Sequence, residues 1–284
     1  MLRWFSGLLI GLCVAASAYA GYVFVASERH MYGFTAPAEF NLPIPSDDEA
    51  IARGRHIAKT RGCGGCHGQS YEGYMLWGEV PTPALSVLVE RMTPAQFNAA
   101  LRHGIDHKGR AMYWMPSYNF VRLTDTDVAE LFAYLRSLPE QEIELPDRFM
   151  TWDVRHDIAF GRDAAIAEYV DDIPPLRGEA LGNPSLVRGE YLAMTTCNEC
   201  HGFSLRADQP WENGGPDMVI INAYDETQFR TLMKTGKAIG DRELELMSMV
   251  ARDRFVHFTE EELDDLYGFL RFLASEALAE EPAT

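Results

Sequence analysis

The feature that most constrains this chain is a five-residue pattern, Cys-x-x-Cys-His, which occurs twice in 284 residues. Two thiols in this spacing can form thioethers with the two vinyl groups of one porphyrin, while the adjoining imidazole ligates the iron. The two copies use four of the five cysteines and each is followed by a Met, so structural-zinc or thioredoxin-like pairs explain them less well. The sequence therefore predicts two covalently bound haem c groups. The attachment residues and proximal ligands would be Cys63, Cys66 and His67 in one copy, and Cys197, Cys200 and His201 in the other.

The charge balance limits the partners. The net charge is −17 and the pI is about 4.8, which argues against nucleic acid as a partner and favours a basic protein partner. We expect the acids between residues 260 and 284 to form a docking face for such a partner, with a solvated acidic tail as the alternative. Haem of the c type is attached to reduced cysteine pairs after export, so the folded part is expected outside the cytoplasm.

The N-terminal stretch determines how the protein is held. Residues 4–27 contain no charge, and their 24 residues exceed the roughly 20 that a helix needs to cross a bilayer. Arg3 would keep the N-terminus inside, which places the haem domains in the periplasm of a bacterial inner membrane. Ala18-Tyr19-Ala20 resembles a signal-peptide cleavage site, and a cleaved signal is the alternative. We expect a retained anchor because the apolar run continues through Val25.

Helix-capping signals mark three helices in the first half. Ser46 with Glu49 opens one helix, Thr93 with Gln96 opens one that ends near Gly104, and Thr124 opens one that ends at Leu138 before Pro139. These signals recur in the second half at an offset of 132–135 residues, so that Thr259 repeats Thr124. No convincing period-2 strand appears. The predicted fold is all-α, with two tandem domains behind a transmembrane helix.

The predicted domain boundaries follow from these signals and from the proline positions. They are an anchor at 1–27, a Pro-containing tether at 28–45, a first domain at 46–140, an inter-domain segment at 141–183, a second domain at 184–275 and an acidic tail at 276–284. The inter-domain segment is too long for a bare linker. We expect it to lie over the domain interface, with a helix at about 160–170.

Both halves resemble the Met-ligated cytochrome c family, a small all-helical domain with the haem motif near its start. The resemblance rests on the haem motifs, Met115-Pro116, Met247-Ser248 and the paired terminal helices. It implies that the first and last helices of each domain cross at a glycine, Gly54 or Gly189. It also implies that the Pro83 and Pro216 carbonyls accept hydrogen bonds from His67 and His201, which would orient each imidazole.

The resemblance also points to the sixth iron ligands. Met115 is preferred over Met112, His103 and His107, because Met-Pro shortly before the C-terminal helix is the family's pattern. Met247 is preferred over Met249, although Met249 matches Met115 better by simple offset. Such methionines can also be core gap-fillers. His103, His107 and His257 are expected on the surface.

These features predict an electron carrier rather than an enzyme. The chain would pass single electrons between a donor complex or dehydrogenase and an acceptor such as a terminal oxidase, with membrane complexes as redox partners. One alternative is the cytochrome subunit of a periplasmic dehydrogenase; the alcohol and gluconate dehydrogenase subunits look similar but have three haem motifs. A dihaem peroxidase is the other, and it would need an open or displaceable iron ligand.

Overall fold

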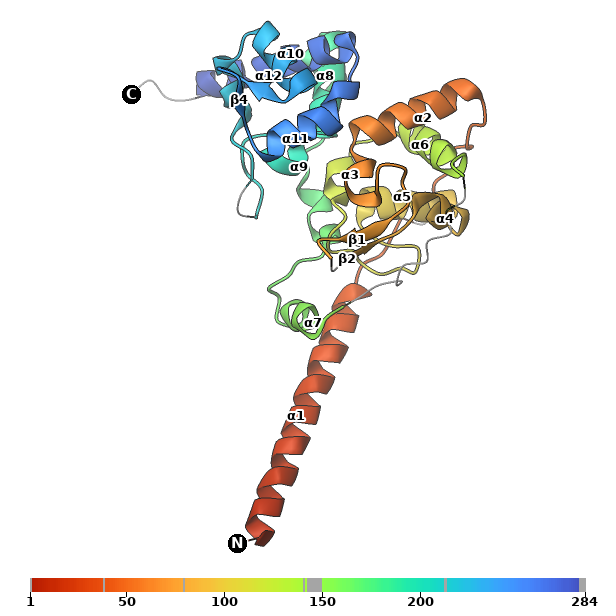
Figure 1. The fold of residues 1–284 in the computed structure, drawn as a ribbon, viewed down its shortest axis with the longest axis vertical. Helices are drawn as coiled ribbons and strands as arrows, with labels where there is room; N and C mark the ends of the chain where they lie inside the picture. The colour runs from red at the N-terminus through yellow and green to blue at the C-terminus, as the bar shows by residue number, and fades with distance from the viewer. Residues whose placement is uncertain are drawn as a thin grey trace.

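The computed structural model describes residues 2–37, 39–78, 80–139, 141, 150–211 and 214–280. One long helix, α1 (Leu2–Met31), leads to two helical lobes that lie beside each other at its C-terminal end (Figure 1). The first lobe comprises residues 48–136 and the second comprises residues 184–280, with a connecting segment between them. The described chain is mostly helical, as predicted.

Each lobe has a short helix at its haem motif between longer helices. The first lobe contains α2 (Asp48–Thr60), α3 (Cys63–His67), β1 (Tyr74–Leu76), β2 (Val80–Thr82), α4 (Leu85–Glu90), α5 (Pro94–His103), η1 (Ser117–Phe120) and α6 (Asp125–Arg136). The second contains α8 (Pro184–Met194), α9 (Asn198–His201), η5 (Met218–Ala223), α10 (Glu226–Thr235), β3 (Lys237–Ala238), β4 (Arg242–Glu243), α11 (Leu246–Asp253), η6 (Phe255–His257) and α12 (Glu260–Glu280). The connecting segment contains α7 (Trp152–Ala159), η2 (Ile166–Glu168), η3 (Val170–Asp172) and η4 (Gly178–Leu181).

Two small hairpins correct the all-α prediction. Strands β1 and β2 pair antiparallel, with Met75 opposite Pro81, and β3 pairs antiparallel with β4. These strands are two or three residues long. Alternation of polar and apolar residues needs about four residues to become visible in a sequence, so the hairpins gave no periodic signal.

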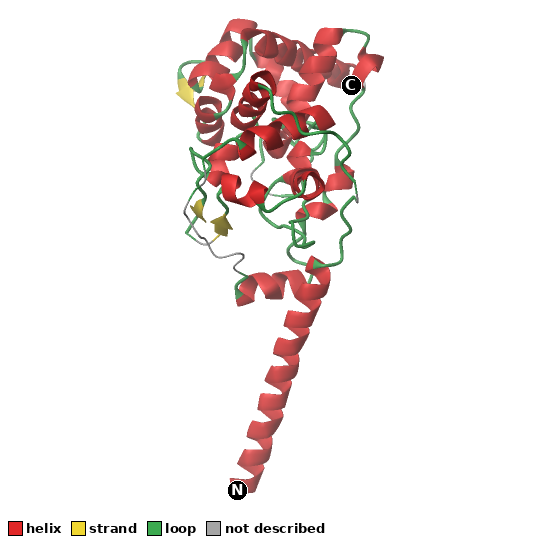
Figure 2. Cartoon of the chain, turned by 90° about the vertical axis from the view of Figure 1, so that its right-hand side faces the viewer, coloured by secondary structure: helices red, strands yellow, loops and turns green. Residues whose placement is uncertain are grey.

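The end of α1 is packed against the folded part and extends four residues into the predicted tether at 28–45. The helix continues to Met31, and its last turns contact α7, which lies across the helix where it meets the rest of the chain (Figure 2). Val23 and Ser27 are fully buried there. The backbone carbonyl of Met31 accepts a hydrogen bond from Ala111 in the first lobe, at 2.8 Å. The end of α1 therefore contacts the first lobe directly, while the described residues 32–37 and 39–47, which form no helix or strand, lead on to α2.

The terminal helices of each lobe cross at a glycine, as predicted. A Cβ on Gly54 in α2 would lie 2.8 Å from the Cβ of Tyr134 in α6. A Cβ on Gly189 in α8 would lie 2.6 Å from the Cβ of Phe269 in α12. Real Cβ atoms do not approach so closely, so only glycine permits these two crossings.

Most of the predicted helix boundaries agree with the structure. Thr93 and Gln96 form the expected capping box, and the Thr124 hydroxyl caps α6. The cap of α2 is Asp47, whose carboxylate accepts from the Ala50 N–H at 2.9 Å, so the prediction of Ser46 was wrong by one residue. Helix α6 ends at Arg136, two residues earlier than predicted. There the Ser137 hydroxyl donates to the Tyr134 carbonyl at 2.7 Å and stops the helix.

The connecting segment contacts both lobes, as expected, but its helix was misplaced. Thr151 caps α7, and Gly161 with φ 67° follows its end, so residues 160–170 do not form the predicted helix. Ile166 donates its N–H to the Met112 carbonyl of the first lobe and packs in the core of the second lobe. After α7, the segment contains three short 3-10 turns, η2 to η4, which leave no amphipathic period.

The acids of α12 from Glu260 to Glu276 are paired within the protein. Glu260 accepts from Arg230 at 2.5 Å, Asp265 from Arg188 at 2.5 Å and Glu276 from Arg177 at 2.7 Å. These contacts pair the carboxylates with bases of the same chain, and the acidic docking face stays a prediction. Residues 276–280 belong to α12 rather than to a separate tail, and residues 281–284 lie outside the described part.

Candidate haem-binding site

The first Cys-x-x-Cys-His motif forms α3 and faces a cavity. Gly62, with φ 74°, turns the chain from α2 into this short helix. Nδ1 of His67 donates to the Pro83 carbonyl at 2.9 Å, as predicted, and this leaves Nε2 available to a metal. Burial lowers the pKa of His67, with the Pro83 hydrogen bond opposing it, so the ring is neutral at pH 7. A neutral imidazole is the form that ligates iron.

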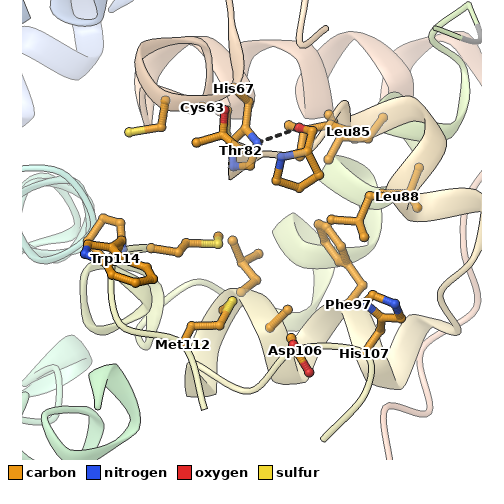
Figure 3. A pocket seen from close by; sticks show the side chains of 18 of the residues that line it. Cys63, His67, Thr82, Leu85, Leu88, Phe97, Asp106, His107, Met112 and Trp114 are labelled. Atoms are coloured by element: carbon orange, nitrogen blue, oxygen red, sulfur yellow. Dashed lines mark hydrogen bonds between the residues drawn. The ribbon is translucent and has the colours of Figure 1, made fainter. Parts of the chain in front are cut away.

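The cavity has a volume of about 700 Å³ and is lined mainly by apolar side chains. His67 and Cys63 lie on one side of it and Met112 lies across from them, with Leu85, Leu88 and Phe97 between (Figure 3). Met115 and Cys66 also line it. His107 is half-buried and lines the cavity too, whereas His257 is exposed, as predicted.

This set of donors fits haem c. Two thiols and an imidazole share one wall, thioethers are available from Met112 and Met115, and the remaining wall is largely apolar. Burial raises the pKa of the Cys63 thiol to about 11. Within the described residues, no group of three or more His, Cys, Asp or Glu side chains could hold a metal ion.

The second motif repeats the geometry of the first. His201 Nδ1 donates to the Pro216 carbonyl at 2.7 Å, and burial lowers the pKa of His201 as it does for His67. Met247 is half-buried and packs against the core of the second lobe. Met249, the competing ligand, has 51% of its surface exposed.

An ion pair that the sequence did not reveal lies between the two motifs. Arg254 of the second lobe pairs with Glu199, inside the second motif, at 2.6 Å. Its side chain also packs against Gly62, and both charged groups line the first cavity. In the sequence, the only local sign of this ion pair is the charge of Glu199 within the second motif, and that charge does not identify Arg254 as its partner.

The lobes also exchange two matched contacts. Nε2 of His56 in α2 lies 2.7 Å from Glu262 in α12, and the Tyr191 hydroxyl in α8 donates to Asp127 in α6. Tyr191 and Glu262 each lie 135 residues after His56 and Asp127, respectively. Corresponding positions of the two halves therefore meet reciprocally, as in a pseudo-two-fold interface.

Comparison with protein families identifies the first lobe. Residues 51–139 match the model of the family described as "Cytochrome c". This lobe is a cytochrome c domain. Covalently bound haem c is the cofactor of such a domain, and the cavity next to Cys63, Cys66 and His67 fits it.

Relatives of this cytochrome chain include subunits of dehydrogenases. It is 25% identical over 277 residues to the cytochrome c subunit of alcohol dehydrogenase (quinone) from Gluconacetobacter polyoxogenes and from Komagataeibacter europaeus, with 81% of this chain and 56% of each relative covered. It is 25% identical over 273 residues to the fructose dehydrogenase cytochrome subunit of Gluconobacter japonicus, covering 83% of this chain and 55% of the relative. The chain thus spans little more than half the length of these relatives.

Proposed function

We propose that this protein is a dihaem c-type cytochrome that carries single electrons on the outer side of a cytoplasmic membrane. The observation that supports it most is the matched proximal geometry, in which His67 and His201 each donate Nδ1–H to a proline carbonyl. The second lobe also repeats the close helix crossing at a glycine, Gly189, and this adds to the support for a second haem-binding lobe. One haem would be attached to Cys63 and Cys66, and the other to Cys197 and Cys200.

The proposed sixth ligands are Met115 and Met247. Both Met112 and Met115 line the first cavity, and Met115 is favoured because it precedes Pro116 as in the resembling family. In the second lobe, Met247 packs against the core whereas Met249 is largely exposed, which favours Met247. A thioether ligand stabilises ferrous iron relative to a second imidazole.

The protein's own contribution is to hold and shield a redox centre. Haem iron supplies a one-electron ferric/ferrous couple when bound. The Pro83 and Pro216 carbonyls fix the imidazole orientation and raise its basicity, and Leu85, Phe97 and their neighbours exclude water. If Met115 and Met247 also hold the irons, neither haem would have an open site for peroxide, which would disfavour the dihaem peroxidase alternative.

Helix α1 is the proposed membrane anchor. Residues 4–31 form the one described helix that is long and apolar enough to cross a bilayer. Arg3 favours an inside N-terminus, which puts both lobes in the periplasm. Membrane-held redox complexes, with a terminal oxidase among the acceptors, would then be within reach.

A second candidate is the cytochrome subunit of a dehydrogenase complex. The relatives named above, which cover most of this chain, favour it. Purification of the tagged protein from gently solubilised membranes tests this candidate. Co-elution of a dehydrogenase that reduces the haems when given its substrate would support it, whereas reduction only by a respiratory complex would support the independent carrier.

The mass of the denatured protein tests the number of haems. The wild type should be heavier than its polypeptide by two haems, and a Cys63→Ala/Cys66→Ala variant should be heavier by one. Cys197→Ala/Cys200→Ala should also retain one haem. The matched control is Cys13→Ala, which lies outside both motifs and should retain two. A wild type with a single haem would contradict the proposal.

A further inference from the structure

Four aromatic side chains gather where α1 meets α7. Tyr19 lies 6.2 Å from Trp152 and 6.3 Å from Phe160, measured between ring centroids, and Tyr22 lies 5.6 Å from Phe160. Each of the four is between 45% and 53% exposed. We call this group of Tyr19, Tyr22, Trp152 and Phe160 the aromatic collar.

The collar marks a boundary along α1. From Trp4 to Tyr22 the described side chains of the helix are exposed all round. Beyond Tyr22 one face is fully buried, at Val23 and Ser27, while Phe24 and Val25 stay exposed. On this second side Arg155 of α7 donates to Ser27 at 3.0 Å, pairs with Glu28 at 2.8 Å and lies over the ring of Phe24. At the collar, a helix that is exposed on all sides thus gives way to one whose inner face is covered by charged and hydrogen-bonded contacts with α7.

The position of this boundary matches the thickness of a bilayer. Trp4 and Tyr22 are 18 residues apart in one helix, or about 27 Å at 1.5 Å per residue. The hydrocarbon core of a bilayer is about 30 Å thick, and Trp and Tyr are enriched at both of its interfaces. Trp4 and Phe5, both exposed, stand at one end of this span, and the collar stands at the other.

We propose that the aromatic collar is a second membrane-contact site, seated among lipid headgroups, with α7 lying on the membrane surface. This inference rests on the membrane anchoring proposed above and adds an element far from α1 in the sequence. Lipid is the occupant that the observations favour, because the collar continues the exposed face of the spanning helix and ends one bilayer thickness from its start.

The collar would also fix the height and orientation of the first lobe. The Met31 carbonyl and His30 of α1 bond to Ala111 and Tyr113, at 2.8 Å each; Ala111 directly precedes the Met112–Met115 segment of the cavity, and Tyr113 lies within it. A helix held at a fixed depth therefore holds this side of the cavity at a fixed distance from the membrane. The partner that exchanges electrons there would be one embedded in, or held close to, the same membrane.

Spin labels on single cysteines test the proposal in the full-length, haem-loaded protein. With Cys13 replaced by Ala, a label is placed at residue 152 or 160, and the protein is incorporated into phospholipid nanodiscs. Power saturation then compares collisions with oxygen, which dissolves in lipid, and with a water-soluble nickel chelate. Ile10→Cys in the middle of α1 and Leu246→Cys in the second lobe, both at exposed positions, are the lipid and water controls.

Labels at 152 and 160 should be several-fold less accessible to the nickel chelate than the label at 246, and accessible to oxygen. If the labels at 152 and 160 were as accessible to the nickel chelate as the label at 246, the collar proposal would be overturned. The anchor proposal would still hold if the label at 10 were exposed to lipid. Protection from both reagents would mean that protein covers the collar, and would also overturn it. A label at 10 that the nickel chelate reaches would instead refute the anchor itself. The haem absorption of each variant confirms that it has folded.

Discussion

Replacing Gly189 by Ala should destabilise the second lobe. The new Cβ would lie 2.6 Å from the Phe269 Cβ and 2.7 Å from the Asp265 carbonyl carbon, where ordinary contacts begin near 3.4 Å. Helices α8 and α12 would have to separate, and the Arg188–Asp265 ion pair and the Ser185–Asp265 hydrogen bond across the crossing would be strained.

The magnitude follows from two opposing effects. Ala is favoured over Gly inside a helix by about 1 kcal/mol. Overpacking of a close-packed contact costs about 1–3 kcal/mol, and the upper end applies here because backbone atoms must move. The net loss should be roughly 2 kcal/mol of the free energy of unfolding of the second lobe.

Guanidinium unfolding, followed by far-ultraviolet circular dichroism and haem absorption, measures this loss. Gly54→Ala should have a similar effect in the first lobe, where its Cβ would meet Tyr134 at 2.8 Å. The matched control is Gly268→Ala, also within α12, whose Cβ would have no atom within 4 Å and which should be neutral or stabilising. Equal stability of Gly189→Ala and Gly268→Ala would refute the close helix crossing.

Three further predictions concern the ligands and the lobe interface. Met247→Ala should remove about half of the weak far-red sulfur–iron absorption of the oxidised protein, and Met249→Ala should leave it unchanged; the reverse result would exchange the two assignments. Burial alone would raise the pKa of Glu262, but hydrogen bonds from His56 and the Thr259 N–H outweigh it and lower the pKa. Its stabilising contribution is therefore complete above its ordinary pKa of about 4.3 and is lost as the pH falls through the lower folded value, so unfolding curves should show a smaller acid-induced loss in His56→Leu than in the wild type. Tyr191→Phe removes the corresponding contact with Asp127 and should leave the acid-induced loss of stability as large as in the wild type. If Tyr191→Phe and His56→Leu reduced this loss equally, Glu262 would not be its source. Arg254→Met would leave the Glu199 carboxylate partly buried without its partner and should cost about 3 kcal/mol, much of which Glu199→Gln should restore in the double variant; additive losses would show that the two residues act independently.

The sequence was informative where the signal was local. The haem motifs, the Thr93 and Thr124 caps and the crossing glycines depend on residues close together in the chain or on a family pattern, and the structure has each of them in place. The proline carbonyls 16 and 15 residues beyond His67 and His201 were also found by pattern.

The remainder depended on contacts between residues distant in sequence. Arg254 and Glu199 are 55 residues apart, and His56 and Glu262 are 206 apart, so no period or spacing connects them. Helix α7 has only eight residues, and it is stabilised by its contacts with α1 rather than by a strong pattern of its own. The basic partners of the α12 acids likewise come from distant parts of the chain, and the sequence did not identify them.

Anaerobic reductive titration is the most direct test of the central claim that each chain carries two one-electron centres. The purified, haem-loaded protein is titrated with a calibrated one-electron reductant while the haem absorption is followed to its end point. Two electrons per chain, taken up without consumption of any substrate, are the result that we predict. An end point at one electron per chain, in protein fully loaded with haem, would contradict the account.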